Sequence, residues 1–113
     1  MKKLLSLFLL ISINLSALDL ICMGNSNTNQ LIQVEVELDK RLGKVTIEGE
    51  THQLQVSNDF LFVWQNKFDN QIYTNSLSRI DGSLSVIAEG AGPDGTPLVR
   101  AILACRDKSD LLF

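Results

Sequence analysis

Residues 31–48 read LIQVEVELDKRLGKVTIE. Apolar residues alternate with acidic or amide residues over 31–38, which is the pattern of a β-strand with one buried and one solvated face. The segment 39–43 combines an Asp with a Gly, and it predicts a hairpin loop in which Gly43 supplies the positive φ. Alternation resumes over 44–48. The stretch therefore predicts two antiparallel strands joined by a short loop.

The same alternation continues toward the C-terminus. Five more strands are predicted, over residues 52–56, 60–64, 71–80, 83–87 and 98–105. The run 60–64 is the most apolar, so we expect it to be the most buried strand. Asp81-Gly82 predicts a two-residue hairpin turn, and loops are expected over 24–30, 66–70 and 90–97 because these segments are polar or rich in Gly and Pro.

Seven short strands with short turns predict an all-β fold, an antiparallel meander. A sheet with one apolar face must bury that face by closing on itself or by packing on a second sheet. We therefore expect a small barrel or a sandwich, and the pattern does not choose between them.

The N-terminus is typical of an export signal. Met1-Lys2-Lys3 is followed by an apolar run over 4–13 and by the small residues Ser16-Ala17. A secretory signal has this order of charge, apolar run and small residues, whereas a membrane anchor needs about 20 apolar residues. We predict a helical signal peptide over 1–17 and a single mature β domain over 18–113. The domain is expected in the periplasm or outside the cell, reached through the general secretion pathway, and not in a membrane after signal cleavage.

Export determines how the two cysteines are interpreted. Cys22 and Cys105 lie near the two ends of the mature domain, and no other cysteine is present. An even number of cysteines in a small exported domain indicates a disulfide, worth roughly 4–5 kcal/mol for so long a loop. A reactive thiol would need a nearby base, and His52 is the only histidine.

The mature domain is acidic. Removal of the signal takes two lysines, which leaves eight basic and 13 acidic residues. Nucleic acids and anionic membranes reward clustered Lys and Arg, so neither is expected as a partner. Negative charge would suit a cationic partner, or it would simply keep the domain soluble.

Catalytic and metal-binding patterns are not evident in the sequence. One histidine and two bridged cysteines do not make a zinc site, and the neighbouring Glu35 and Glu37 fit the solvated face of a strand. We predict no metal, no cofactor and no catalytic residue, and we expect the protein not to be an enzyme. A small hydrolase is the third alternative, and it would need a pocket that gathers His52 with an acid and a serine.

Two aromatic residues and one arginine are candidates for binding. Phe68 and Tyr73 flank a polar turn, where aromatic side chains can anchor a partner, although both would fit a core equally well. Arg79 precedes the Asp81-Gly82 turn, and its stem would suit a structural role, covering apolar surface.

Several short motifs resemble those of a group of small exported proteins. They are Cys22-Met23-Gly24, the segment LSRIDGSL over 77–84, ACRDK over 104–108, and the final LLF over 111–113. With these motifs the chain resembles small exported bacterial and phage β-rich proteins of unknown function. The chain departs from them in its Gly90–Pro97 loop and in Ala104. The resemblance implies a fold and a compartment, but no activity.

A second, weaker resemblance is to periplasmic inhibitors of c-type lysozyme. These are small exported β-barrels with a Cys-x-Gly start, a disulfide to the C-terminal region and a lysine-bearing strand that meets the enzyme. Trp64-Gln65-Asn66-Lys67 is loosely similar to that strand, although the expected Ser-Gly loop is missing. An acidic barrel would complement a basic lysozyme.

These observations lead to an exported, non-catalytic binding protein as the first hypothesis and a lysozyme inhibitor as the second. The partner would be a protein or a small ligand, with lysozyme as the alternative. The candidate binding surface consists of Trp64, Lys67, Phe68, Tyr73 and Arg79.

Overall fold

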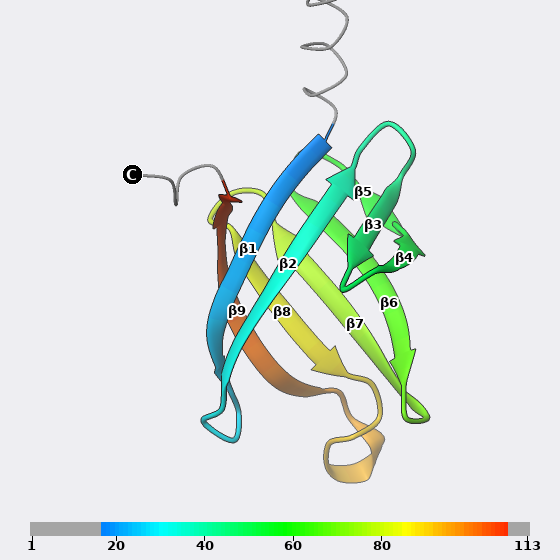
Figure 1. The fold of residues 1–113 in the computed structure, drawn as a ribbon. Helices are drawn as coiled ribbons and strands as arrows, with labels where there is room; N and C mark the ends of the chain where they lie inside the picture. Colours follow the sequence, from blue (N-terminus) through cyan, green and yellow to red (C-terminus); the bar gives the residue numbers. More distant parts are fainter. Residues whose placement is uncertain (1–16, 109–113) are drawn as a thin grey trace, which may run out of the picture.

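The computed structural model describes residues 17–108. The predicted signal helix lies outside the described residues except for Ala17, and so does the LLF end of the chain. The fold is all-β, as the alternation predicted. It is one antiparallel sheet of nine strands in the order β4-β3-β2-β1-β9-β8-β7-β6-β5 (Figure 1).

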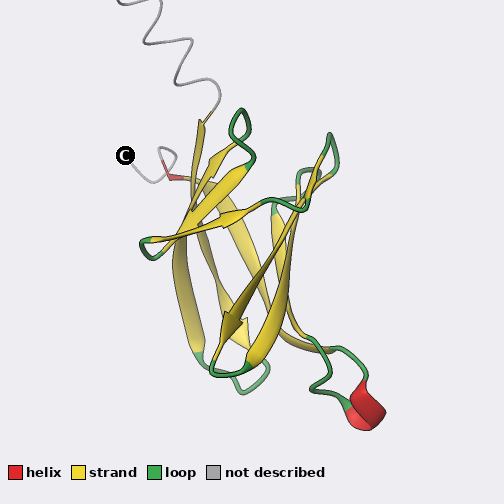
Figure 2. Cartoon of the chain, turned by 90° about the vertical axis from the view of Figure 1, so that its right-hand side faces the viewer, coloured by secondary structure: helices red, strands yellow, loops and turns green. Residues whose placement is uncertain are grey.

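The strands are β1 (Ala17–Ser26), β2 (Leu31–Asp39), β3 (Lys44–Ile47), β4 (Glu50–Gln53), β5 (Val56–Ser57), β6 (Leu61–Phe68), β7 (Gln71–Ser78), β8 (Ser83–Ala88) and β9 (Leu98–Asp107). A 3₁₀ turn, η1 (Pro93–Gly95), lies in the predicted loop before β9 (Figure 2).

The strand count of seven was wrong for two reasons. First, β1 is a full strand that runs into the segment predicted as a loop, and the turn that follows it covers only residues 27–30. Second, the strand predicted over 52–56 is divided into β4 and β5 at Leu54 and Gln55. These two residues carry the chain from one edge of the sheet to the other, so they cannot stay in a single strand.

Two turns also differ from their predictions. The polar segment 66–70 is strand as far as Phe68, and only Asp69 and Asn70 form the turn, with φ of 53° and 64°. Two consecutive left-handed residues define the type I′ turn that suits the twist of a hairpin. The β7–β8 connection is a four-residue loop over 79–82 and not a two-residue turn, and the Gly82 N–H donates to the Ser78 carbonyl oxygen at 3.0 Å.

The sheet curls into a half-barrel, so the sandwich alternative was wrong. Each strand pairs with a neighbour in sequence, except that β1 pairs with β9 and thereby joins the two ends of the domain. The residues between β4 and β5 tie the two edges together: the Leu54 N–H donates to the Gly43 carbonyl oxygen at 2.8 Å, and the Gln55 N–H to that of Val63 at 2.7 Å. This crossing closes the upper end of the half-barrel in Figure 1.

The hydrophobic core fills the closed end. Its buried side chains come from β1, β2, β3, β6, β7, β8 and β9, and they are Cys22, Val36, Leu38, Val45, Phe62, Trp64, Leu77, Leu84, Ala101 and Leu103. The run 60–64 supplies the two largest of them, Phe62 and Trp64, as predicted, although Phe60 and Leu61 face outward.

The predicted disulfide between Cys22 and Cys105 is confirmed. The two residues lie directly opposite each other in the β1–β9 pairing, with their Cα atoms 4.0 Å apart. Cys22 is fully buried, with 0% of its surface exposed. The bond therefore fastens the one strand pairing that joins segments far apart in the chain.

Candidate functional site

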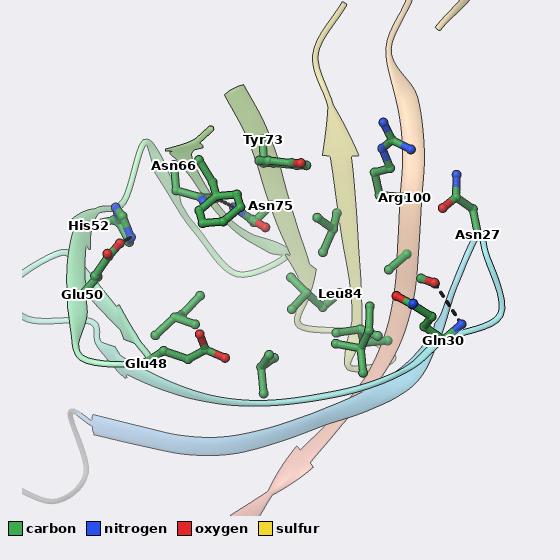
Figure 3. A pocket seen from close by; sticks show the side chains of 18 of the residues that line it. Asn27, Gln30, Glu48, Glu50, His52, Asn66, Tyr73, Asn75, Leu84 and Arg100 are labelled. Carbon is green, nitrogen blue, oxygen red and sulfur yellow. Dashed lines mark hydrogen bonds and ion pairs between the residues drawn. The ribbon is translucent and has the colours of Figure 1, made fainter. Parts of the chain in front are cut away.

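The open end of the half-barrel contains a cavity of about 650 Å³ (Figure 3). Small-molecule sites in proteins usually enclose about 300–1,000 Å³. The cavity exists because β3 and β4 have only four residues each, whereas β2, β6 and β7 have eight or nine. The short strands help to close the upper end and leave the inward faces of the long strands uncovered at the lower end.

The floor of the cavity is apolar, and polar side chains lie around it. Inward-facing aliphatic side chains from β2, β3, β8 and β9 form the floor, namely Ile32, Val34, Ile47, Leu84, Val86 and Leu103. The polar side chains come from three places: the β1–β2 turn with Asn27 and Gln30, the β3–β4 hairpin with Glu48, Glu50 and His52, and the strands that carry Asn66, Tyr73, Asn75 and Arg100.

Arg100 reaches the cavity because β9 contains a β-bulge. Val86 pairs with Ala101 but Ile87 pairs with Val99, so Arg100 has no partner in β8. One extra residue reverses the alternation of inward and outward side chains beyond it. As a result Arg100 and Ala101 both line the cavity, although they are adjacent in the chain.

The Arg100 side chain has an unsatisfied donor. Its Nε is buried and has no hydrogen-bond partner, and no salt bridge within residues 17–108 involves its guanidinium. Its carbonyl oxygen accepts a hydrogen bond from the Asn27 N–H at 2.7 Å, which fixes the bulge against the β1–β2 turn. Buried donors in native proteins nearly always have a partner, and within residues 17–108 the buried side-chain atoms without one are Arg100 Nε at the cavity and Trp64 Nε1 in the core.

A second polar group lies on the β6–β7 wall. Asn75 is the only polar or charged residue in the described chain that is classed as buried, with 6% of its surface exposed. Its Nδ2 donates to Asn66 Oδ1 at 2.8 Å across the β6–β7 pair. Tyr73 is half-buried on the same wall, and Figure 3 shows its ring between these amides and Arg100.

His52 lies on the opposite side of the cavity from Arg100 (Figure 3). Its Nε2 is 3.7 Å from Glu50 Oε2, and the exposed fractions of the two side chains are 22% and 77%. Ser26 also lines the cavity, so the three residue types that a hydrolase would need are present. The Ser26 hydroxyl, however, accepts hydrogen bonds from the N–H groups of Thr28 and Gln30, and within residues 17–108 no hydrogen bond joins it to His52.

The structure divides the candidate binding surface predicted from the sequence. Phe68 and Tyr73 both line the cavity. Trp64 is fully buried in the core, and Lys67 is exposed on the outer face of β6. Arg79 lies on the loop after β7, where its guanidinium stands 4.8 Å from the centre of the Phe62 ring and donates to the Asn58 carbonyl oxygen. The five residues therefore do not form one surface.

The same loop holds Asp81, whose carboxylate organises the turn. Asp81 Oδ1 accepts hydrogen bonds from the N–H and the hydroxyl of Ser83, at 3.0 and 2.8 Å. These bonds, with a further one from Ser78, hold the pKa of Asp81 below its ordinary value of 3.8. Hydrogen bonds to the ionised form of a carboxyl group favour that form. The ionised Asp81 side chain therefore stabilises the β7–β8 loop.

Most of the polar cavity residues were missed by sequence reasoning. Asn66 and Asn75 occupy inward positions of strongly alternating strands, between Trp64 and Phe68 and between Tyr73 and Leu77. A polar residue on an otherwise apolar face is a signal that could have identified them. Arg100 had no such signal, because regular alternation with Ala101 inward places it outside.

Residues 17–108 contain no group of three or more His, Cys, Asp or Glu side chains arranged to hold a metal ion. They also contain no helix of the length and apolar character that crossing a membrane requires.

No protein-family model, curated protein or solved structure matches this chain.

Proposed function

We propose that this protein is an exported, non-catalytic binding protein that holds a small, largely apolar ligand in the open end of the half-barrel. The observation that carries the proposal is the cavity of about 650 Å³ with an aliphatic floor. Water in contact with such a floor is unfavourable by roughly 25 cal/mol per Å² of apolar surface. A ligand that covers the floor would recover this free energy.

The covalent structure supports export to the periplasm or to the outside of the cell. The Cys22–Cys105 disulfide suits an oxidising compartment. The sequence over 1–17 has the charge and apolar pattern of a secretory signal. The bond also fastens β1 to β9, the strand that carries Arg100, so one wall of the cavity is held in place before a ligand arrives. A site formed in advance loses less affinity to ordering on binding.

The test uses N-phenyl-1-naphthylamine, an uncharged dye that fluoresces more strongly in apolar surroundings. We expect saturable enhancement with the mature protein. Val34→Trp should weaken it, because this half-buried side chain lines the cavity floor and a larger one would take up part of the space. Gln33→Trp is the matched control, since Gln33 is the adjacent residue of β2 and faces outward. If the Val34→Trp protein does not fold, Val86→Phe is a second variant that reduces the volume of the cavity.

Two results would overturn the proposal. One is a lack of saturable dye binding by the folded wild type. The other is equal dye binding by the two β2 variants, which would place the dye outside the cavity. Assaying c-type lysozyme with micromolar protein separates the alternative: unchanged lysis supports a small ligand, whereas inhibition that the dye cannot relieve would replace this proposal with a lysozyme inhibitor.

A further inference from the structure

We propose that the ligand is an amphipathic monocarboxylate, whose apolar part covers the cavity floor and whose carboxylate pairs with Arg100. This inference rests on the proposed function and adds the chemical class of the ligand. It follows from the bulge in β9, the unsatisfied guanidinium and the distribution of charge around the cavity.

The positive charge of the cavity lies at one position. Arg100 is the only Lys or Arg that lines the cavity in the described part of the chain. A regular strand would place it in solvent, and the bulge between the Val86–Ala101 and Ile87–Val99 pairs turns it inward instead. β-Bulges are frequent beside functional sites, where they redirect a side chain.

The guanidinium of Arg100 has the chemistry to bind a carboxylate. The buried Nε of Arg100 has no partner, and a guanidinium presents its N–H groups as a planar fork. That fork matches the two oxygens of a carboxylate, which can accept two parallel hydrogen bonds. A bound carboxylate would satisfy the buried donor and neutralise the half-buried charge in one contact.

The charges around the cavity limit the sign and the number of charges on the ligand. Glu48 and Glu50 lie across the cavity from Arg100 (Figure 3), so an anionic group is favoured only on the Arg100 side. One arginine balances one negative charge. The mature domain has eight basic and 13 acidic residues, and this excess of negative charge opposes ligands with several negative charges such as phosphomonoesters. A single carboxylate with an apolar chain fits these constraints.

The experiment compares dodecanoate with dodecanol as competitors of N-phenyl-1-naphthylamine. The two have the same apolar chain and differ in the carboxylate. We expect dodecanoate to displace the dye from the wild type at about tenfold lower concentration, a difference equivalent to about 1.4 kcal/mol. Arg100→Met keeps an apolar stem but removes the charge, so it should raise the dodecanoate concentration needed to displace the dye and remove the preference for dodecanoate over dodecanol. Arg106→Met is the matched control on the same strand, because Arg106 is exposed.

The outcomes separate this inference from the proposed function. If wild type and Arg100→Met bind both competitors equally, the carboxylate assignment is wrong and the binding function stands. If Arg106→Met loses the preference as well, the effect is one of general charge, and the assignment is equally wrong. If neither competitor nor the dye binds the folded wild type, the proposed function itself fails. Thermal unfolding of each variant shows that the protein compared is folded, and Arg100→Lys, which keeps the charge without the fork, should show an intermediate preference.

Discussion

Removal of the Cys22–Cys105 bond should cost this domain much of its stability. The bond closes a loop with a sequence separation of 83 residues. In the chain-entropy model a loop of this length lowers the entropy of the unfolded chain by an amount worth about 4.5 kcal/mol at 25 °C. Small domains have a net stability of about 5–15 kcal/mol. Loss of the bond is therefore expected to lower the melting temperature by roughly 20–35 °C.

The assay compares oxidised and reduced wild-type protein in urea, so that every side chain except the bridge is the same. Trp64 is the only tryptophan of the chain and is fully buried, so its fluorescence reports unfolding directly. Because Cys22 is fully buried and Cys105 is half-buried, the bond should be reduced in urea before refolding, so that every molecule is reduced. Reducing and non-reducing gels, together with thiol titration, show the state of each sample.

A loss smaller than about 1 kcal/mol would refute this reasoning, since the entropic term predicts several times as much. It would mean that the unfolded chain already keeps β1 close to β9 without the bond. Free thiols in the protein as purified would remove the main support for an oxidising compartment. A larger m-value for the reduced protein is expected, because an uncrosslinked chain exposes more surface on unfolding.

Three further predictions concern the strands and the β7–β8 loop. Gly24→Ala should lower stability by about 1–3 kcal/mol, because a Cβ there would lie 2.6 Å from the Ile102 carbonyl oxygen; urea unfolding measures the loss. Arg79→Met should cost about 0.5–1 kcal/mol through its contact with the Phe62 ring, and dye titration should show unchanged affinity. Asp81→Ala should lower stability at neutral pH. The difference from wild type should shrink as the pH falls through 3.8 and below, because the hydrogen bonds that lower the pKa of Asp81 stabilise the fold only while its carboxylate is ionised.

Each of these predictions has a contrary result. Wild-type stability in the Gly24 variant would show that β9 can move away from β1, and Met23→Ala is the control because Met23 faces outward on the same strand. Loss of dye binding in the Arg79 variant would return that residue to the binding surface. A difference for the Asp81 variant that does not change with pH would show that the hydrogen bonds from Ser83 do not depend on its charge.

Local patterns were enough to predict most strands. The predicted segments 31–38, 44–48 and 83–87 agree with β2, β3 and β8 to within one residue at each end, because alternation with a period of two is a property of a few consecutive residues. The disulfide was predictable for a different reason, since two cysteines allow only one pairing.

The missed elements depend on contacts between distant segments. β1 is a full strand through its pairings with β2 and with β9, and no pattern near residue 24 reveals the second of these partners. The division of 52–56 into β4 and β5 follows from the curl of the whole sheet, which brings Gly43 and Val63 to the two sides of residues 54 and 55.

In the candidate site, too, local sequence patterns predicted some residues, and contacts between distant segments decided the others. Phe68 and Tyr73 were predicted as binding residues from a local turn, and both line the cavity, whereas Trp64 and Arg79 were proposed with them and lie elsewhere. The sequence by itself determined the alternating strands, the pairing of the two cysteines and the acidic charge. Only the tertiary structure decided that the closed end is solid core and the other end a cavity, and that Arg100 lines it. The physical reason is that burial and the register of a bulge are set by which strands meet across the sheet, and strands far apart in the chain leave no local pattern of that meeting.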